Sequence, residues 1–200
     1  GIANCVAIGA NAFYGDATNT TTGTDGTVAI GKDSLKILTT GSGNVAIGLE
    51  SMKATTTGYK TTAVGWNSLY TNSTGYSNTA IGAESLYYTN SDENVAVGDR
   101  SGAYTTGDAN TYVGFKSGFG ASGAEANNVG VGHNSLLAVT TGSGNVAVGK
   151  SALDAVTTSS NNTAVGYNAL TNNGDSYNNV AIGKDAGDTI TNSGAFNTLI

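Results

Sequence analysis

A short repeat, about seventeen residues long, runs through the whole chain and limits what the chain can fold into. Its most constant element is an aliphatic residue followed by glycine, and the intervals between successive glycines are 22, 17, 17, 17, 16, 16, 18, 17, 17 and 17. A short and nearly constant period is typical of architectures in which each unit contacts only its neighbours. The glycines that define the repeat are Gly9, Gly31, Gly48, Gly65, Gly82, Gly98, Gly114, Gly132, Gly149, Gly166 and Gly183.

The residues before each glycine predict a short β-strand. Ile or Val directly precedes the glycine, Ala precedes that residue in nine of twelve units, and Val or Thr comes one place earlier. A segment such as Val45-Ala46-Ile47 alternates with period two, so we predict Val45 and Ile47 on the core face and the small residue on the other face. The Ala column is interrupted by Tyr112, Gly130 and Leu199.

The residues after each glycine predict a turn and a second extended piece. Glycine ends the strand because it turns freely into positive φ. Two variable residues, then Ser or Ala, and usually Leu, Met or Phe follow it, and a Thr/Ser/Asn/Gly turn closes the unit. In three units Gly replaces the residue at the Leu position, at Gly102, Gly118 and Gly187. Two short extended pieces and two turns per unit predict an all-β fold, a parallel β-solenoid of about 17-residue coils. Units this short and rich in Gly, Thr and Asn cannot supply the two helices of a helical repeat.

We expect residues 1–200 to form a single repeat array of about eleven coils, open at both ends, with an insertion around residues 13–26. One such coil buries too little apolar surface to offset the entropy of ordering it, so its stability must come from neighbouring coils. A column of Asn four places before the glycine is predicted to form a hydrogen-bonded structural ladder. It contains Asn44, Asn78, Asn94, Asn110, Asn128, Asn145, Asn162 and Asn179.

The thin core also predicts lateral packing of the chain against copies of itself. The small Ala and Ser/Ala columns are expected to permit this close approach, and a homotrimer is the natural closed arrangement. An end-to-end fibre is the other form of self-association that we expect.

Composition excludes several classes of function. Gly, Thr, Asn and Ser make up half of the chain, and eight Lys and Arg against 14 Asp and Glu give a net charge of −6. Nucleic-acid binding needs clustered Lys and Arg, and this chain has one Arg. No apolar run approaches the roughly 20 residues of a membrane-spanning helix. The single Cys5 permits no internal disulfide.

The repeat resembles the repeats of two families of fibrous proteins. Asn-Val-Ala-Ile-Gly-x-x-Ser is similar to the head repeats of trimeric autotransporter adhesins, and the longer form Asn161-Asn-Thr-Ala-Val-Gly-Tyr-Asn-Ala-Leu170 is similar to repeats of phage tail-fibre-like proteins. The resemblance covers the whole chain and implies a trimeric β-roll that projects from a cell or virion and contacts a host surface. The repeat unit of this chain is longer than that of the adhesin heads.

The variable position directly after each glycine is predicted to form an exposed ridge. It holds charged, apolar and aromatic residues alike, so Trp66, Phe115, His133 and Tyr167 are the candidates for contact with a ligand or partner. Packing between protomers and contact with a surface glycan or receptor are the two interpretations of these side chains. Tyr59, Tyr76 and Tyr177, which lie in the turn before the Asn column, are expected to widen such a surface.

Three other functions fit parts of the pattern less well than attachment. The Gly-x-x-Ser-Leu segments also match the hexapeptide pattern of hexapeptide-type acyltransferases. In those enzymes the hexapeptide recurs three times per coil, whereas in this chain it occurs once per coil. An ice-binding monomeric solenoid needs a Thr-x-Thr column, whereas the strand column mixes Val with Thr. A monomeric solenoid that forms filaments end to end is the other alternative of this kind. With one His and one Cys the chain offers neither a catalytic triad nor a soft metal site.

The sequence therefore predicts a non-enzymatic structural segment of an extracellular adhesin or phage tail fibre. We expect it to lie at a cell surface or on a virion, to need no cofactor and no metal, and to associate with itself and with a host surface glycan or receptor.

Overall fold

The structure is a computed structural model that describes residues 4–15, 22–120, 123–172, 176–188 and 196–200. Chain contacts divide it into two compact units, residues 1–99 and 100–200. The first unit contains β1 (Val6–Ile8), β2 (Val28–Ile30), β3 (Val45–Ile47), β4 (Thr62–Val64), β5 (Thr79–Ile81) and β6 (Val95–Val97). The second contains β7 (Thr111–Val113), β8 (Val129–Val131), β9 (Val146–Val148), β10 (Thr163–Val165), β11 (Val180–Ile182) and β12 (Thr198–Leu199).

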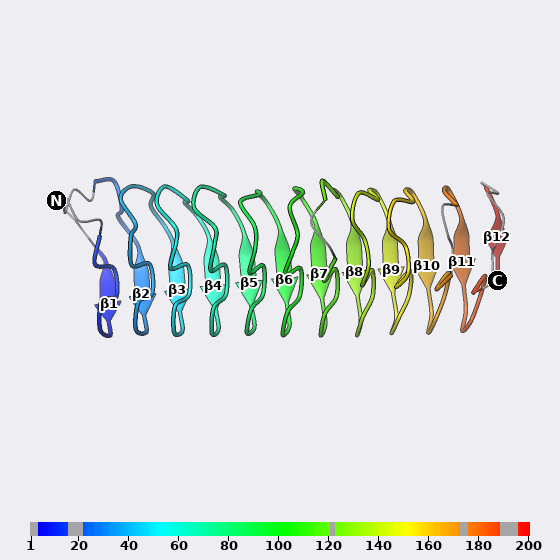
Figure 1. Cartoon of the computed structure of the whole chain (residues 1–200), viewed down its shortest axis with the longest axis horizontal. Coiled ribbons are helices and arrows are strands. Elements are labelled where there is room, and N and C mark those ends of the chain that lie inside the picture. Colours follow the sequence, from blue (N-terminus) through cyan, green and yellow to red (C-terminus); the bar gives the residue numbers. More distant parts are fainter. Residues whose placement is uncertain (1–3, 16–21, 121–122, 173–175, 189–195) are drawn as a thin grey trace. The chain divides into compact units, whose positions relative to one another are not determined.

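Within each unit every strand pairs in parallel with the next strand along the chain (Figure 1). The register joins equivalent positions of the repeat, so that Ala46 lies opposite Ala63 and Ala147 opposite Ala164. No helix occurs among the described residues. The predicted all-β parallel solenoid, with one repeat of the sequence per coil, is therefore confirmed. Of the predicted insertion at residues 13–26, residues 16–21 lie outside the described part of the chain.

The prediction of which strand face is buried was wrong. From β2 to β11 the middle residue of each strand is buried and the two flanking residues are wholly or partly exposed. Ala46 is 0% exposed, whereas Ile47 is 36% exposed. The small Ala and Ser columns are thus inside the solenoid, and they cannot form the close lateral contact with another copy that the sequence suggested.

The reason lies in the corner that follows each strand. The Leu or Met of this corner is fully buried, and it adopts a left-handed backbone with φ near +50° at Leu35, Met52, Leu69 and Leu86. This conformation costs an L-residue about 1–2 kcal/mol, which burial of a large side chain offsets. Because the Leu fills the interior, the strand residue facing the interior has to be small.

The repeat glycines are required by the close approach of successive coils. Their φ values run from 127° to 143°, which side-chain-bearing residues rarely adopt. A Cβ built on Gly48 would lie 2.3 Å from the carbonyl oxygen of Gly65 in the next coil. Equivalent contacts of 2.2–2.5 Å occur at Gly31, Gly65, Gly82, Gly114, Gly132, Gly149 and Gly166.

The Asn column joins each coil to the next through both atoms of its amide group. Asn128 Oδ1 accepts a hydrogen bond of 2.9 Å from the backbone N of Asn145, and its Nδ2 donates to the carbonyl oxygen of Gly142 at 2.8 Å. The same Oδ1 contact repeats from Asn145 to Asn162 and from Asn162 to Asn179. All eight predicted Asn are buried, so these bonds satisfy polar groups that water does not reach.

Buried serines make a second column of contacts at the corner. Ser34, Ser85 and Ser101 each donate a hydroxyl hydrogen bond of 3.0 Å to the carbonyl oxygen of the middle strand residue in the next coil. These bonds fix the corner of one coil to the strand of the next.

Two of the interruptions in the Ala and Leu columns, Tyr112 and Gly118, compensate each other in the second unit. Tyr112 takes the place of a buried Ala and is itself 0% exposed. Its ring occupies the space of the missing Leu, because a Cβ on Gly118 would lie 2.3 Å from the ring atom Cε1. Gly118 keeps the left-handed backbone that Leu adopts elsewhere, with φ 59°.

Substitution of Gly48 tests the coil contact. We expect Gly48→Ala to lower the free energy of unfolding by about 3 kcal/mol or more, because of its backbone conformation and the contact with Gly65. Gly43→Asn is the matched control: its φ is 69°, Asn occupies this repeat position at Asn161 and Asn178, and the nearest atoms are 4.0 Å away. Urea denaturation followed by circular dichroism measures both. Equal losses in the two variants would contradict the proposed role of the contact.

Replacement of Tyr112 and Gly118 by the usual Ala and Leu tests whether the two residues compensate each other. We expect Tyr112→Ala to cost about 3–5 kcal/mol through the cavity it leaves, and Gly118→Leu to be destabilising through the clash with the ring. The double variant restores the usual Ala and Leu, so it should be more stable than either single variant. A double-mutant cycle from denaturation curves measures the coupling, and additive losses would show that the two sites do not share one space.

Candidate functional site

The outward strand positions form an uncharged face in each unit. The first strand position is Val or Thr in every unit, the position two residues later is Val or Ile, including Ile200 directly after β12, and none of these residues is charged. Among them, Ile8, Ile47 and Ile81 in the first unit and Val113, Val131, Val148 and Ile182 in the second are exposed. Contiguous exposed apolar residues of this kind mark surfaces that contact other molecules. Thr occurs only at the first of the two outward positions, so no strand has the Thr-x-Thr pair that an ice-binding face requires.

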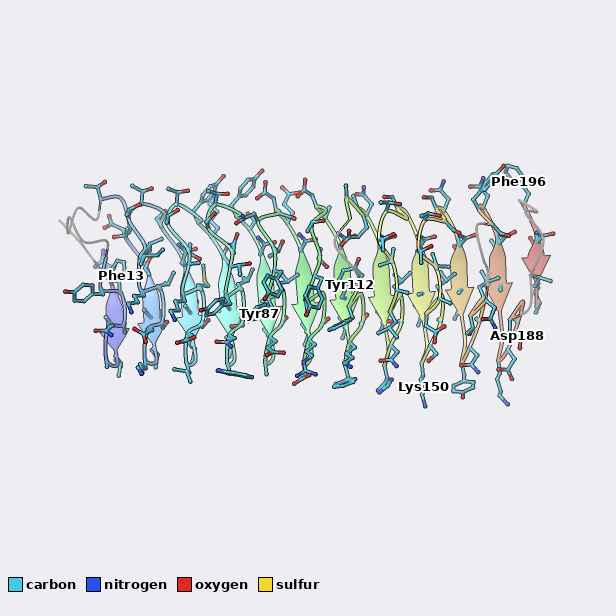
Figure 2. All side chains as sticks on the ribbon, viewed as in Figure 1. Phe13, Tyr87, Tyr112, Lys150, Asp188 and Phe196 are labelled. Carbon is cyan, nitrogen blue, oxygen red and sulfur yellow. The ribbon has the colours of Figure 1, made fainter. Side chains whose placement is uncertain are left out.

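The predicted ridge is exposed, and in the second unit several of its residues stack on one another. In the first unit Trp66 is 50% exposed. In the second unit Phe115 and His133 stack with ring centroids 5.1 Å apart and planes 26° apart. Tyr167 lies between Lys150 and Lys184, whose Nζ atoms are 5.7 and 5.9 Å from its ring centroid. Figure 2 shows the Lys150 side chain extending outward on this edge.

Two further tyrosine stacks lie in the first unit. Tyr59 and Tyr76 stack with ring centroids 4.9 Å apart, with Lys60 Nζ over the Tyr59 ring. Tyr70 and Tyr87 stack with ring centroids 5.1 Å apart. They are not among the residues predicted from the sequence to form a contact surface. Both lie at the position after the buried Leu, and their spacing of one repeat is the signal that could have identified them.

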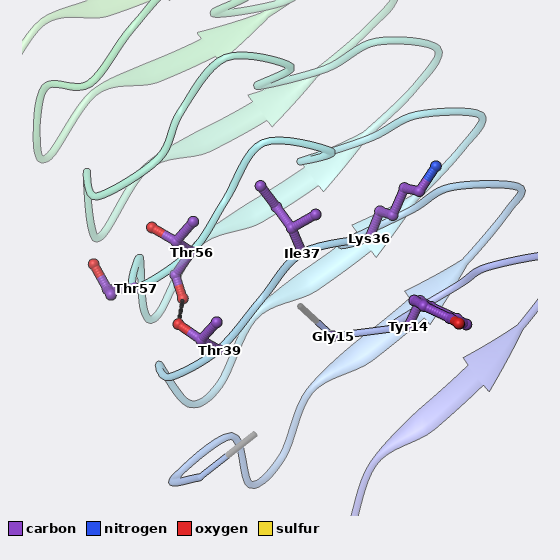
Figure 3. A pocket seen from close by; sticks show the side chains of 7 residues that line it. All are labelled: Tyr14, Gly15, Lys36, Ile37, Thr39, Thr56 and Thr57. Carbon is purple, nitrogen blue, oxygen red and sulfur yellow. Dashed lines mark hydrogen bonds between the residues drawn. The ribbon is translucent and has the colours of Figure 1, made fainter. Parts of the chain in front are cut away.

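A shallow groove of about 620 Å³ in the first unit carries little polar chemistry (Figure 3). The hydroxyls of Thr39 and Thr56 donate to carbonyl oxygens of the following coils at 3.0 and 3.1 Å. Lys36 pairs with Asp33 at 3.0 Å, and the hydrogen bond from Asn11, together with Lys36, holds the pKa of Asp33 below its ordinary value. The lining residues are Tyr14, Gly15, Lys36, Ile37, Thr39, Thr56 and Thr57.

A buried polar cluster surrounds Tyr112 in the second unit. The Glu125 side chain accepts a hydrogen bond of 3.2 Å from the backbone N of Thr106 at Oε1. Its Oε2, the Tyr112 hydroxyl and the Thr105 hydroxyl are buried, and none of them makes a hydrogen bond of ordinary geometry with the described residues. Burial raises the pKa of Glu125 to about 7, and burial together with this carboxylate raises the pKa of Tyr112 above its ordinary value. Nothing in the sequence pointed to Glu125, although Tyr112 marked the coil as unusual.

The described residues hold no group of three or more His, Cys, Asp or Glu side chains that could bind a metal ion. Likewise, none of the described segments is a helix of the length and apolar character needed to cross a membrane. His133 stacks on Phe115 at the exposed ridge, whereas the serines of the corner column are buried against backbone carbonyls.

Comparison of the chain with protein-family models, with curated proteins and with solved structures gave no match.

The Glu125 carboxyl is expected to make the second unit less stable as the pH rises. Its pKa of about 7 in the folded chain is above the ordinary value of 4.5, so the folded state favours the protonated form. The stability from this group is greatest below pH 4.5 and is lost as the pH rises towards and through 7. At 1.36 kcal/mol per pKa unit, unfolding at pH 8 should require about 2–3 kcal/mol less than at pH 5 from this group alone.

Glu125→Gln supplies the control, because the amide has the same shape and does not titrate. Urea denaturation at pH 5, 6, 7 and 8 should show the pH dependence in the wild-type chain and a flatter profile in the variant. The same slope in both chains would show that Glu125 does not cause it.

Proposed function

We propose that this chain is a non-enzymatic segment of an extracellular fibre, of the adhesin or tail-fibre kind, that associates with copies of itself and presents its ridge for attachment to a host surface. The observation that carries the proposal is the uncharged outward strand face beside the exposed ridge. The resemblance of the repeat to adhesin heads and tail-fibre-like proteins supports the same assignment. No catalytic step, cofactor or metal enters the proposal.

The outward strand face is the proposed contact between copies. Its side chains are β-branched and repeat once per coil, so two copies present matching rows of the same shape. A charged or polar partner would gain little from this face, because it offers no charge and few side-chain hydrogen-bonding groups. Burying the exposed Ile and Val columns would supply the apolar area that the thin core of one chain lacks.

The ridge is the proposed attachment surface. It lies directly after the strand, separated from it by the repeat glycine, so burial of the strand face leaves the ridge side chains accessible at its border. Trp66, Phe115, His133 and Tyr167 all keep exposed surface in the single chain.

The native mass of the segment tests the assembly. By sedimentation equilibrium we expect three times the chain mass of 19.8 kDa, with resistance to heating in detergent. Ile81→Asp, on the strand face, should lower the mass to that of the monomer with an unchanged circular dichroism spectrum. Ala83→Asp is the matched control, because it places the same charge two residues later on the ridge, where Asp99 already occurs.

A monomeric wild-type segment would contradict the proposed assembly. A trimer that persists in the Ile81→Asp chain would contradict the assignment of the contact between copies to the strand face.

A further inference from the structure

All Lys and Arg residues of the second unit lie on one edge of it. Arg100, Lys116, Lys150 and Lys184 occupy the first or second position after a repeat glycine, although the chain as a whole is acidic. The second-unit ridge, defined as Phe115, Lys116, His133, Lys150, Tyr167 and Lys184, therefore combines cations with aromatic rings. Asp185, which pairs with Lys184 at 3.4 Å, is the one acidic residue at these positions of the unit.

The ring faces of this ridge have cationic or aromatic neighbours. The faces of Phe115 are contacted by His133 and by Lys116, whose Nζ is 5.4 Å from the ring centroid. The Nζ atoms of Lys150 and Lys184, from the coils before and after, lie 5.7 and 5.9 Å from the Tyr167 ring centroid. A ring whose faces have such neighbours is less accessible for stacking on a neutral sugar. Its edge carries the positive end of the ring quadrupole, so ring edges and ammonium groups both make the ridge electropositive.

The lysines of this ridge recur at every second coil. Neighbouring parallel strands lie about 4.8 Å apart, so Lys150 and Lys184, two coils apart, are separated along the stack by about 10 Å. Extended sugar chains that carry a carboxylate or sulfate on each residue or on alternate residues place their charges at similar intervals.

From this geometry we propose that the second-unit ridge binds an acidic polysaccharide, whose carboxylate or sulfate groups pair with Lys116, Lys150 and Lys184 and accept a hydrogen bond from His133. The inference rests on the proposed function, because it names the class of surface molecule that the ridge contacts. A nucleic acid fits less well, because single-stranded binding uses accessible ring faces, which here have neighbouring cations or rings, and duplex binding needs a broader array of cations than one row.

Titration of the wild-type segment with size-defined heparin and with hyaluronan tests the proposal, with neutral dextran as the reference. We expect binding of at least one acidic chain, a decrease in affinity with added salt, and no binding of dextran. Lys150→Gln/Lys184→Gln should weaken binding by about tenfold. Lys53→Gln/Lys60→Gln removes the same net charge from the first unit and should leave the affinity nearly unchanged.

Three results would overturn the inference. The first is equal binding of dextran, the second is an equal loss in the two double variants, and the third is a single-stranded oligonucleotide that binds more tightly than either polysaccharide. Failure here is distinguishable from failure of the proposed function: a trimer that binds no acidic polysaccharide removes only the ligand, whereas a monomer contradicts the assembly itself.

Discussion

The close approach of successive coils at the repeat glycines is the constraint on which the rest of each unit depends. No Cβ fits between the Gly48 and Gly65 backbones, so the coils stack at the spacing of a parallel sheet and in one register. That spacing places every side chain directly beside the side chain at the same position of the next coil. Columns of Asn, Ser, Leu and aromatic residues are the direct consequence, because a residue type that tolerates itself as a neighbour can be repeated at every coil.

The same stacking separates an interior of fixed volume from a surface that is free to vary. Inside, one Leu and one Ala per coil fill the space, and a change at one position requires an opposite change at another, as Tyr112 and Gly118 show. Outside, the ridge accepts Trp66, Ala83 and Lys150 at equivalent positions without a change of backbone. Because the interior is one Leu deep, much of the aliphatic surface of the strands stays outside it. In the proposed assembly, burial of the exposed strand face would link the stability of the fibre to the association of its chains.

The period, the strand positions and the Asn column could all be predicted, because each depends on local residue types that recur. The choice of the buried strand face could not. In Val45-Ala46-Ile47 the alternation is equally compatible with either face inward, and the larger residues suggested the wrong one. The choice is made by Leu35 and its equivalents, which reach the interior from a left-handed backbone that Leu seldom adopts. Exposure of the ridge follows from its variability, but the stacking of its rings and cations depends on contacts between coils. Glu125 was beyond prediction, because its burial arises from the irregular coil that holds Tyr112.

The strand face and the ridge have opposite physical character, and this difference allows one segment to carry both parts of the proposed function. An uncharged aliphatic face is stabilised by removal from water and is insensitive to salt, whereas the cations of the ridge act through charge and lose strength as salt is added. In the proposed assembly, association of copies through the strand face brings several ridges into one particle, and the second-unit ridge repeats its cations along the stack. Weak contacts of single lysines then act together on one long acidic chain, because binding at one coil raises the effective concentration of the ligand at the next. In a solenoid fibre of this kind, the repeat that stabilises the stack also determines the valency of attachment.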